Sequence, residues 1–398
     1  MKMKSSKKHI LTEIIKAGEG MDLSGIRTPG VPIFQTSNYL YDDVDSGTEI
    51  LLSKRPGHIY ARYTNPTIDA LNGLVAKLEN TEQALSFASG MAAISSTFLA
   101  VCQPGDHIVS SAFIYGGTYT FFQTQLSRLK IDVTFVDPRD HRALTEAIRP
   151  NTKVLYTEPL ANPTLIASDF SFWKQLAEKH NCLLITDSTF TPPPIFRPLD
   201  WGADIVIHSA TKYLGGHSDL LGGVVAGSEK MIELIRPVMK TYGPVMAPMI
   251  AWLLIRGIRT LGVRLERQNQ SALALAEFLS AHKKVNKVFY AGLQENPQHD
   301  LAKKQFDGYS GMLAFEVKGG WPEARKVMQN LETILFAVSL GDVSSLISHP
   351  ASTSHVYLSP EERKTIGVSD GLLRLSVGLE YIDDLKDDLD QALEKASS

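Results

Sequence analysis

The chain has 398 residues, 43% of them hydrophobic, and a formal net charge of −3. This length predicts more than one domain, and a slightly acidic chain without a basic stripe is not typical of a nucleic-acid-binding protein. The longest apolar stretches are interrupted by Ser and Gly, and no apolar segment follows the N-terminal lysines, which argues against a membrane span and a signal peptide.

The two cysteines, Cys102 and Cys182, each lie in an apolar run without a second Cys or a His at metal-binding spacing. This pattern predicts buried free thiols and no metal site. Free thiols are typical of a reducing compartment, so we expect a cytoplasmic protein. The charge and the interrupted apolar stretches described above lead us to expect no nucleic-acid or membrane partner.

Residues 1–60 are rich in turn-forming residues and have little hydrophobic periodicity. Such a segment cannot build its own core, so we predict an arm that lies on the main body or on a neighbouring subunit. A helix is predicted from Pro66, with Asn65 as its N-cap. Just before it, Tyr60 and Arg62 are candidate phosphate ligands; the alternative is a surface tyrosine and an ordinary salt-bridging arginine.

Strands and helices then alternate along the chain. The predicted strands are 84–87, 107–112, 133–136, 154–157, 183–186 and 203–208, and the predicted helices lie near 89–100, 117–129, 141–149 and 169–180. This alternation predicts a mostly parallel sheet with right-handed crossovers. No G-x-G-x-x-G follows the first strand, so a dinucleotide-binding fold is not indicated.

Candidate binding residues follow several of these strands. Gly90 and Met91 begin a helix whose free amides could bind an anion. Tyr115 begins 115-YGGTY-119, where glycines would let a flat ligand approach, and Asn162 lies in the polar turn 158-EPLANPT-164. Asp187 ends a buried strand and is either a helix cap or the partner of a protonated ring nitrogen, and we favour the second.

Lys212 lies in the segment 203-ADIVIHSATKYLGGHSDLLGGVVAG-227, just beyond the end of a predicted strand. Open α/β sheets bind ligands at the carboxyl ends of their strands. A lysine there can lose its charge by desolvation and hold a carbonyl group as a Schiff base. Ser209 and Thr211, close to Lys212 in the sequence, are candidate phosphate ligands. The alternative is an ordinary surface lysine.

The pattern changes beyond residue 228. A helical stretch over 248–282 is interrupted by glycine, and shorter units follow: strands 312–317, 335–338 and 372–377 and helices 321–331 and 382–396. We predict a smaller α+β domain from about residue 257. Arg374 lies inside an apolar strand, where its planar fork suits a carboxylate. An internal salt bridge to Glu380 or to an aspartate is the competing interpretation.

Taken together, these residues could hold each part of pyridoxal 5'-phosphate: its aldehyde, ring nitrogen, ring face and phosphate. The chain resembles the cystathionine/methionine-metabolism family of pyridoxal-phosphate enzymes, the trans-sulfuration enzymes. The resemblance covers about residues 27–396. Its motifs are 60-YARYTNPT-67, 89-SGMAA-93, 115-YGGT-118, 158-EPLANPT-164, 187-DSTF-190, 209-SATKYLGGHSD-219 and 371-GLLRLSVGLE-380.

The resemblance implies roles for the residues above. Lys212 would hold the cofactor and shuttle protons, Asp187 would keep the ring nitrogen protonated, and Tyr115 would stack on the ring and protonate the leaving group. The phosphate would be bound by Gly90, Met91, Ser209 and Thr211 together with Tyr60 and Arg62 of a neighbouring subunit. The substrate carboxylate would be bound by Arg374, Ser339 and Asn162.

The family has the aspartate-aminotransferase-like α/β fold, so we expect a mostly parallel central sheet in a large domain and a smaller C-terminal α+β domain. The expected division is an arm at 1–60, a cofactor-binding domain at 61–256 and a small domain at 257–398. Because Tyr60 and Arg62 serve across an interface in this family, the resemblance implies a homodimer, usually paired into a homotetramer.

Fewer positions distinguish the reactions of this family from one another than identify its cofactor site. Val338 stands where cystathionine γ-lyases and γ-synthases carry glutamate, and its apolar side chain favours an uncharged methyl thioether. Gly117, where methionine γ-lyases usually have cysteine, points the other way. We expect γ-elimination of L-methionine to 2-oxobutanoate, methanethiol and ammonia. The alternatives are a cystathionine γ- or β-lyase and a γ-replacement transferase such as an O-acylhomoserine sulfhydrylase or cystathionine γ-synthase.

Overall fold

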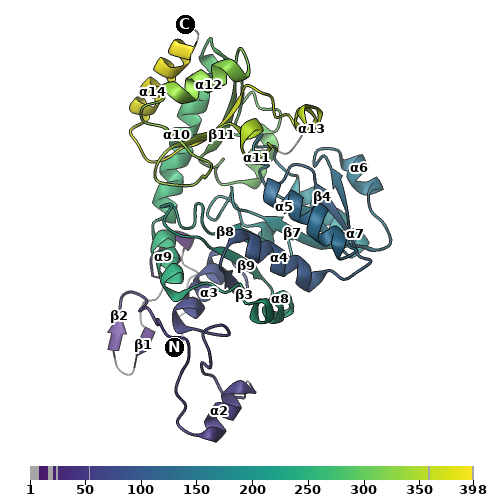
Figure 1. The fold of residues 1–398 in the computed structure, drawn as a ribbon, viewed down its shortest axis with the longest axis vertical. Helices are drawn as coiled ribbons and strands as arrows, with labels where there is room; N and C mark the ends of the chain where they lie inside the picture. Colours follow the sequence, from purple (N-terminus) through teal and green to yellow (C-terminus); the bar gives the residue numbers. More distant parts are fainter. Residues whose placement is uncertain (1–8, 17–20, 24–25, 53, 357–358, 397–398) are drawn as a thin grey trace, which may run out of the picture.

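The computed structural model describes residues 9–16, 21–23, 26–52, 54–356 and 359–396. Two large sheets organise these residues, one of seven strands and one of five. Figure 1 shows the seven-stranded sheet in the middle of the molecule, with the C-terminal elements at one end and the N-terminal segment at the other.

The seven-stranded sheet has the order β3-β9-β8-β7-β6-β4-β5. Strands β4 to β8 are parallel, whereas β9 is antiparallel to both β3 and β8, which confirms a mostly parallel sheet. The bounds are β3 Gln83–Phe87, β4 His107–Ser111, β5 Asp132–Val136, β6 Thr152–Thr157, β7 Leu183–Asp187, β8 Ile205–Ser209 and β9 Gly223–Gly227.

Helices cover both faces of this sheet because successive strand residues point in opposite directions. In β8, Ile205 and Ile207 pack into one buried cluster with α4 (Gly90–Val101) and α8 (Glu229–Tyr242), while Val206 packs into the other with α3 (Pro66–Leu78) and α7 (Phe170–His180). Asn65 accepts hydrogen bonds from the first amides of α3, as its position before Pro66 predicts.

The five-stranded sheet has the order β10-β11-β14-β13-β12, with bounds β10 Val285–Phe289, β11 Met312–Val317, β12 Leu335–Phe336, β13 Leu346–Ser348 and β14 Leu372–Ser376. Helices α12 (Trp321–Asn330) and α14 (Ile382–Ala396) pack against each other beside it. The stretch over 248–282 is broken at Thr260 into α9 (Pro248–Arg259) and α10 (Leu261–Ala281), as the glycine-interrupted pattern predicts.

The N-terminal segment divides into two parts. Helix α1 (Ile10–Ile15) packs on α3 and α9, and Ile14 is buried. The short strands β1 (Met21–Leu23) and β2 (Ile26–Thr28) pair with each other, and α2 (Val44–Leu51) lies apart from the body in Figure 1. Leu40 is 99% exposed and Val44 85%, so this chain alone does not cover the second part.

Some element predictions need correction. The strand predicted over 335–338 ends at Phe336, so Val338 lies in a loop. The helix predicted near 117–129 begins as α5 (Gly116–Thr120) and continues as a π-helix over Phe121–Leu126. The sequence reasoning missed the N-terminal elements α1, β1, β2 and α2, and later in the chain α8, β10, β13 and the short helices α11 (His299–Gln305) and α13 (Pro360–Thr365). None of the helices in the described ranges combines the length and the apolar character that a membrane crossing needs.

Candidate active site

A cavity of about 970 Å³ lies where the carboxyl ends of the parallel strands face the five-stranded sheet. Most of the predicted site residues line it, although they come from distant parts of the chain. Those lining residues are Gly90, Met91, Tyr115, Asn162, Asp187, Ser209, Thr211, Lys212 and Arg374.

Lys212 follows β8, and its ammonium nitrogen donates a hydrogen bond to Ser339 Oγ at 2.9 Å. Ser339 therefore joins the site through Lys212. Burial, and then the positive charge of Arg374, lower the pKa of Lys212. A lowered pKa makes the unprotonated, nucleophilic amine easier to form, as an imine-forming lysine requires.

Asp187 is the last residue of β7 and is almost fully buried. Its Oδ1 accepts hydrogen bonds from both the backbone amide and the hydroxyl of Thr189. Burial raises the pKa of Asp187, although these hydrogen bonds and the nearby charge of His208 lower it. The residues after it form a turn and not a helix, so the helix-cap interpretation is wrong.

Another part of the cavity wall is built from small residues. Ser89 caps α4 by accepting a hydrogen bond from the amide of Ala92, and Gly90 begins the helix. A Cβ atom on Gly90 would lie 2.8 Å from the Cβ of Ser209, so only glycine lets the helix end approach β8 this closely. The amides of the first helical turn have no partner within the helix, and with Ser209 they form a cradle for an anion.

Arg374 lies within β14 and is buried. Its two terminal nitrogens donate to Asn162 Oδ1 and to the carbonyl of Ser339, both at 3.1 Å. Glu380 instead accepts hydrogen bonds from the amide and hydroxyl of Ser345, so the predicted alternative, an Arg374–Glu380 salt bridge, is wrong. The fork of Arg374 is thus held at the cavity by neutral acceptors and keeps its positive charge for an anion.

Tyr115 lines the cavity and is 45% exposed. Gly117 lies directly beneath its ring, because a Cβ atom there would lie 2.5 Å from Tyr115 Cε1. Any larger residue at position 117 therefore requires the Tyr115 ring to move.

Two of the acidic and basic side chains that line the cavity were not predicted. Glu158 follows β6 and accepts a hydrogen bond from the Tyr115 amide at 2.7 Å, and His355 comes from the segment 349-HPASTSH-355. The rule that selected Asp187, a carboxyl group directly after a buried strand, would also have selected Glu158. No comparable signal identified His355.

Tyr60 and Arg62 do not line this cavity. Arg62 donates to the carbonyl of Lys240 and lies over the ring of Tyr63, with Cζ 4.7 Å from the ring centroid. Within one chain, the structure therefore does not bring these two predicted phosphate ligands to the site.

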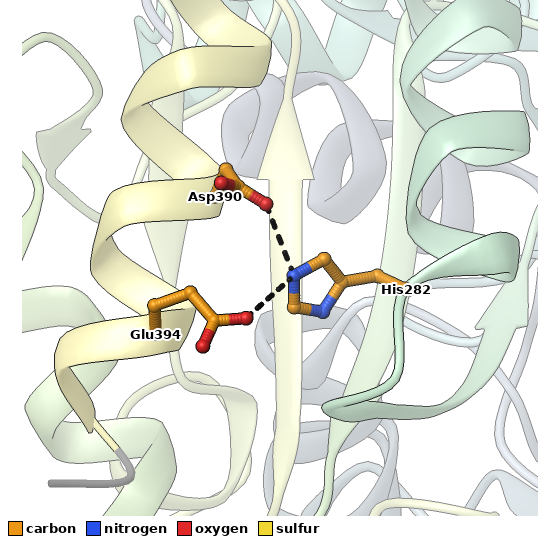
Figure 2. A group of neighbouring side chains, drawn as sticks. All are labelled: His282, Asp390 and Glu394. Atoms are coloured by element: carbon orange, nitrogen blue, oxygen red, sulfur yellow. Dashed lines mark hydrogen bonds and ion pairs between the residues drawn. The ribbon is translucent and has the colours of Figure 1, made fainter.

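A second cluster of titratable groups lies outside the cavity. Figure 2 shows His282 pointing toward Asp390 and Glu394 of α14, with its Nε2 3.2 Å and 3.8 Å from their oxygens. The amide of Lys284 donates to His282 Nδ1, so the ring proton must lie on Nε2. Nε2 then donates to Asp390, and the cluster ties α14 to the end of α10.

Comparisons with known proteins agree with this geometry. The model of the family described as "Cys/Met metabolism PLP-dependent enzyme" matches residues 11–394. The chain belongs to this family. It is 40% identical to an L-methionine gamma-lyase of Fusobacterium nucleatum, over 99% of this chain and all of that protein. It is 43% identical to a cystathionine gamma-lyase of Bacillus subtilis, over 92% of this chain and 94% of that one.

Among solved structures, a Campylobacter jejuni protein bearing N'-pyridoxyl-lysine-5'-monophosphate superposes with a TM-score of 0.92. It is 33% identical, and the match covers 97% of this chain and all of that one. This family member therefore has the pyridoxal-phosphate enzyme fold that its motifs predict, and it uses pyridoxal phosphate as cofactor.

The cavity fits that cofactor on its own chemistry. A lysine with a lowered pKa, a buried carboxylate and a cradle of small residues lie around one space, which suits an aldehyde, a ring nitrogen and a phosphate. Tyr115 offers a ring for stacking on one wall.

Proposed function

We propose that this enzyme catalyses γ-elimination of a sulfur amino acid, with L-methionine and water giving 2-oxobutanoate, methanethiol and ammonia. The lyase relatives at about 40% identity support this reaction. The observation that carries the choice of substrate is Val338, an apolar residue at the cavity beside Ser339.

Bound pyridoxal phosphate would supply an aldehyde that condenses with amino groups and a ring that accepts an electron pair. Lys212 would bind the aldehyde and, once displaced by the substrate, remove the Cα proton as an amine. Asp187 would keep the ring nitrogen protonated. Tyr115, on the open side of the cavity, would donate a proton to the departing sulfur.

The substrate carboxylate would be oriented by Arg374, whose fork faces the cavity from β14. Asn162 and Ser339 already bond Arg374, so they would hold its fork in place as well as contact the carboxylate. The phosphate would lie on Gly90, Met91, Ser209 and Thr211. Thr211 Oγ1 also accepts from the amide of Gly222, which fixes the glycine-rich loop beside it.

The charges around the cavity favour a small apolar leaving group. Among the described lining residues, the acidic and basic side chains are Glu158, Asp187, Lys212, His355 and Arg374. Burial lowers the pKa of His355 to about 4, so it is neutral near pH 7, and the others have the partners given above. Cystathionine would bring a second ammonium and carboxylate, and among these described lining residues no free positive charge remains for the second carboxylate.

The competing functions are a cystathionine γ- or β-lyase and a γ-replacement transferase that joins an O-acylated homoserine to a thiol. Gly117 is the feature that favours them. The deciding experiment gives the cofactor-loaded enzyme L-methionine alone and measures 2-oxobutanoate and methanethiol. We expect both products in equal amounts. No reaction with methionine, together with turnover of cystathionine or of O-acetylhomoserine plus sulfide, would reject methionine as the substrate.

We further propose a homodimer, paired into a tetramer, in which Tyr60 and Arg62 complete the phosphate site of the neighbouring copy. Both residues lie away from their own cavity, and the exposed apolar side chains near α2 need a covering surface. We retain the division into an arm at 1–60, a cofactor-binding domain at 61–256 and a small domain at 257–398. The buried free thiols support a cytoplasmic location.

A further inference from the structure

Glu158 is a buried carboxyl group to which the mechanism above gives no role. It directly follows β6, is only 5% exposed and lines the same cavity as Asp187. Its Oε1 accepts a hydrogen bond from the backbone amide of Tyr115 at 2.7 Å. Glu158 therefore contacts the main chain of the residue that would flank the cofactor ring, near the carboxyl group that would face the ring nitrogen.

The two carboxyl groups influence each other. Burial, and then the charge of Asp187, raise the pKa of Glu158 well above its ordinary value, against the lowering effect of the Tyr115 amide. Two neighbouring buried carboxyl groups rarely ionise together, because each disfavours the negative charge of the other. We therefore expect one of the two to hold a proton at neutral pH.

Their surroundings decide which one holds the proton. Asp187 Oδ1 receives two donors, the amide and the hydroxyl of Thr189, whereas Glu158 receives the single Tyr115 amide. A carboxylate that accepts more hydrogen bonds keeps its negative charge more easily. A protonated ring nitrogen can neutralise only one anion, which would be Asp187.

No other described group supplies Glu158 with a counter-charge. The hydroxyl of Tyr156 is a neutral neighbour, since burial and then both carboxyl charges raise its pKa well above the usual value. Lys212 and Arg374 line the same cavity, but their hydrogen bonds go to Ser339 and Asn162. Neither cation bonds Glu158.

We propose that Glu158 is a neutral carboxylic acid that positions the main chain of Tyr115, which leaves Asp187 as the only anion at that end of the cavity. The carbonyl oxygen of the Glu158 acid would accept the hydrogen bond from the Tyr115 amide. Because the acid is protonated, no second negative charge would lie near the cofactor ring. Glu158 is thus a positioning residue. The proposal rests on the cofactor, and it does not depend on which sulfur amino acid is the substrate.

Two variants separate charge from positioning. Glu158→Gln has the same shape and can still accept the Tyr115 hydrogen bond through its amide oxygen, but it can carry no charge. Glu158→Met has a similar volume and cannot accept that bond. Asp187→Asn, which removes the assigned anion, is the reference for a real loss of charge.

The readouts are the dissociation constant of pyridoxal phosphate from the apoprotein and the pH midpoint of the cofactor's absorption spectrum in the loaded enzyme. We expect Glu158→Gln to keep both near the wild-type values, with a midpoint change of less than about 0.3 pH unit. Glu158→Met should weaken cofactor binding about tenfold, the equivalent of one hydrogen bond. Asp187→Asn should shift the midpoint by about one unit or more.

Other results would overturn the proposal. A midpoint shift in Glu158→Gln as large as in Asp187→Asn would show that Glu158 is ionised. Wild-type cofactor binding in Glu158→Met would show that it positions nothing. If Glu158→Met does not fold, Glu158→Gln still shows whether Glu158 carries a charge. An infrared difference spectrum between wild type and Glu158→Gln gives a second test, because the stretching band of the protonated carboxyl group must disappear in Glu158→Gln.

Discussion

The two sheets contribute to one cavity in different ways. The seven-stranded sheet presents Asp187, Ser209 and Lys212 at or just beyond the ends of two adjacent parallel strands, β7 and β8. The five-stranded sheet provides Arg374 from within β14, but it places Val338 and Ser339 on a loop after the short edge strand β12. Backbone pairing thus fixes the residues of the cofactor side and Arg374, whereas a loop presents Val338 and Ser339.

This difference shows where specificity can change without loss of the cofactor. Strand ends are held by the hydrogen bonds of the sheet, so a change there alters the site that all members of the family need. A loop tolerates substitution, because few backbone partners depend on it. Variants on the two sides should therefore fail in different ways.

The largest effect is expected on the cofactor side. Lys212→Ala should lower turnover by at least about 10²–10⁴-fold, because it removes the proposed general base, and should abolish the absorption band of the lysine-bound cofactor. Steady-state kinetics and an absorption spectrum measure both. Lys230→Ala, an exposed lysine on α8, is the control and should behave as wild type. Unchanged activity in Lys212→Ala would reject the assigned site.

Arg374→Lys tests the substrate side and should have the next largest effect. The charge is kept, but the planar fork that bonds Asn162 and Ser339 is lost. Disturbing a buried, hydrogen-bonded charge costs about 2–5 kcal/mol, so we expect KM to rise roughly 30-fold or more with an unchanged cofactor spectrum. Arg325→Lys, at an exposed position on α12, is the matched control. A changed spectrum with normal KM would place Arg374 on the cofactor side.

The pH dependence of the free energy of unfolding tests the burial of His107 in the large sheet. His107 is fully buried, and its two ring nitrogens lie 2.8 and 2.9 Å from the hydroxyls of Thr152 and Thr134. Burial lowers its pKa to about 4 from the usual 6.5. Between these values the unfolded chain binds a proton that the folded chain does not, so the free energy of unfolding falls as the pH drops.

This loss should reach about 3 kcal/mol near pH 4. His107→Gln should remove the corresponding part of the pH dependence between pH 6.5 and 4 in urea unfolding, although it also lowers stability at pH 7.5. His180→Gln, at an exposed position on α7, should leave the slope unchanged. If wild type and His107→Gln had equal slopes, His107 would already be protonated in the folded protein.

The smallest effect is expected at the loop. Val338 is 68% exposed and lines the cavity, so Val338→Glu would offer a carboxylate to the distal ammonium of cystathionine. We expect the ratio of kcat/KM for cystathionine over methionine to rise about tenfold, or 1.4 kcal/mol. Leu335→Glu, on β12 and outside the cavity, is the control. No change in the ratio would show that Val338 does not select the substrate.

Much of the cofactor side was predictable because its signals are local. Asp187 and Lys212 each follow a run of β-branched residues, and Gly90 opens an apolar helix, so strand ends and a helix start identify them. The prediction for Val338 was less accurate, since it lies in a loop and not in the strand expected over 335–338. A two-residue edge strand has too little pattern to show where it ends.

The sequence by itself determined which chemical groups this protein has and which of them follow strands, because hydrophobic periodicity and turn residues are local properties. Only the tertiary structure decided which groups meet. Arg374 bonds Asn162 across 212 positions of the chain, Glu158 bonds the amide of Tyr115, and Tyr60 and Arg62 stay away from their own cavity. The first pairing depends on how the two sheets pack together, and the second on which strands are neighbours in the large sheet. No local pattern encodes either.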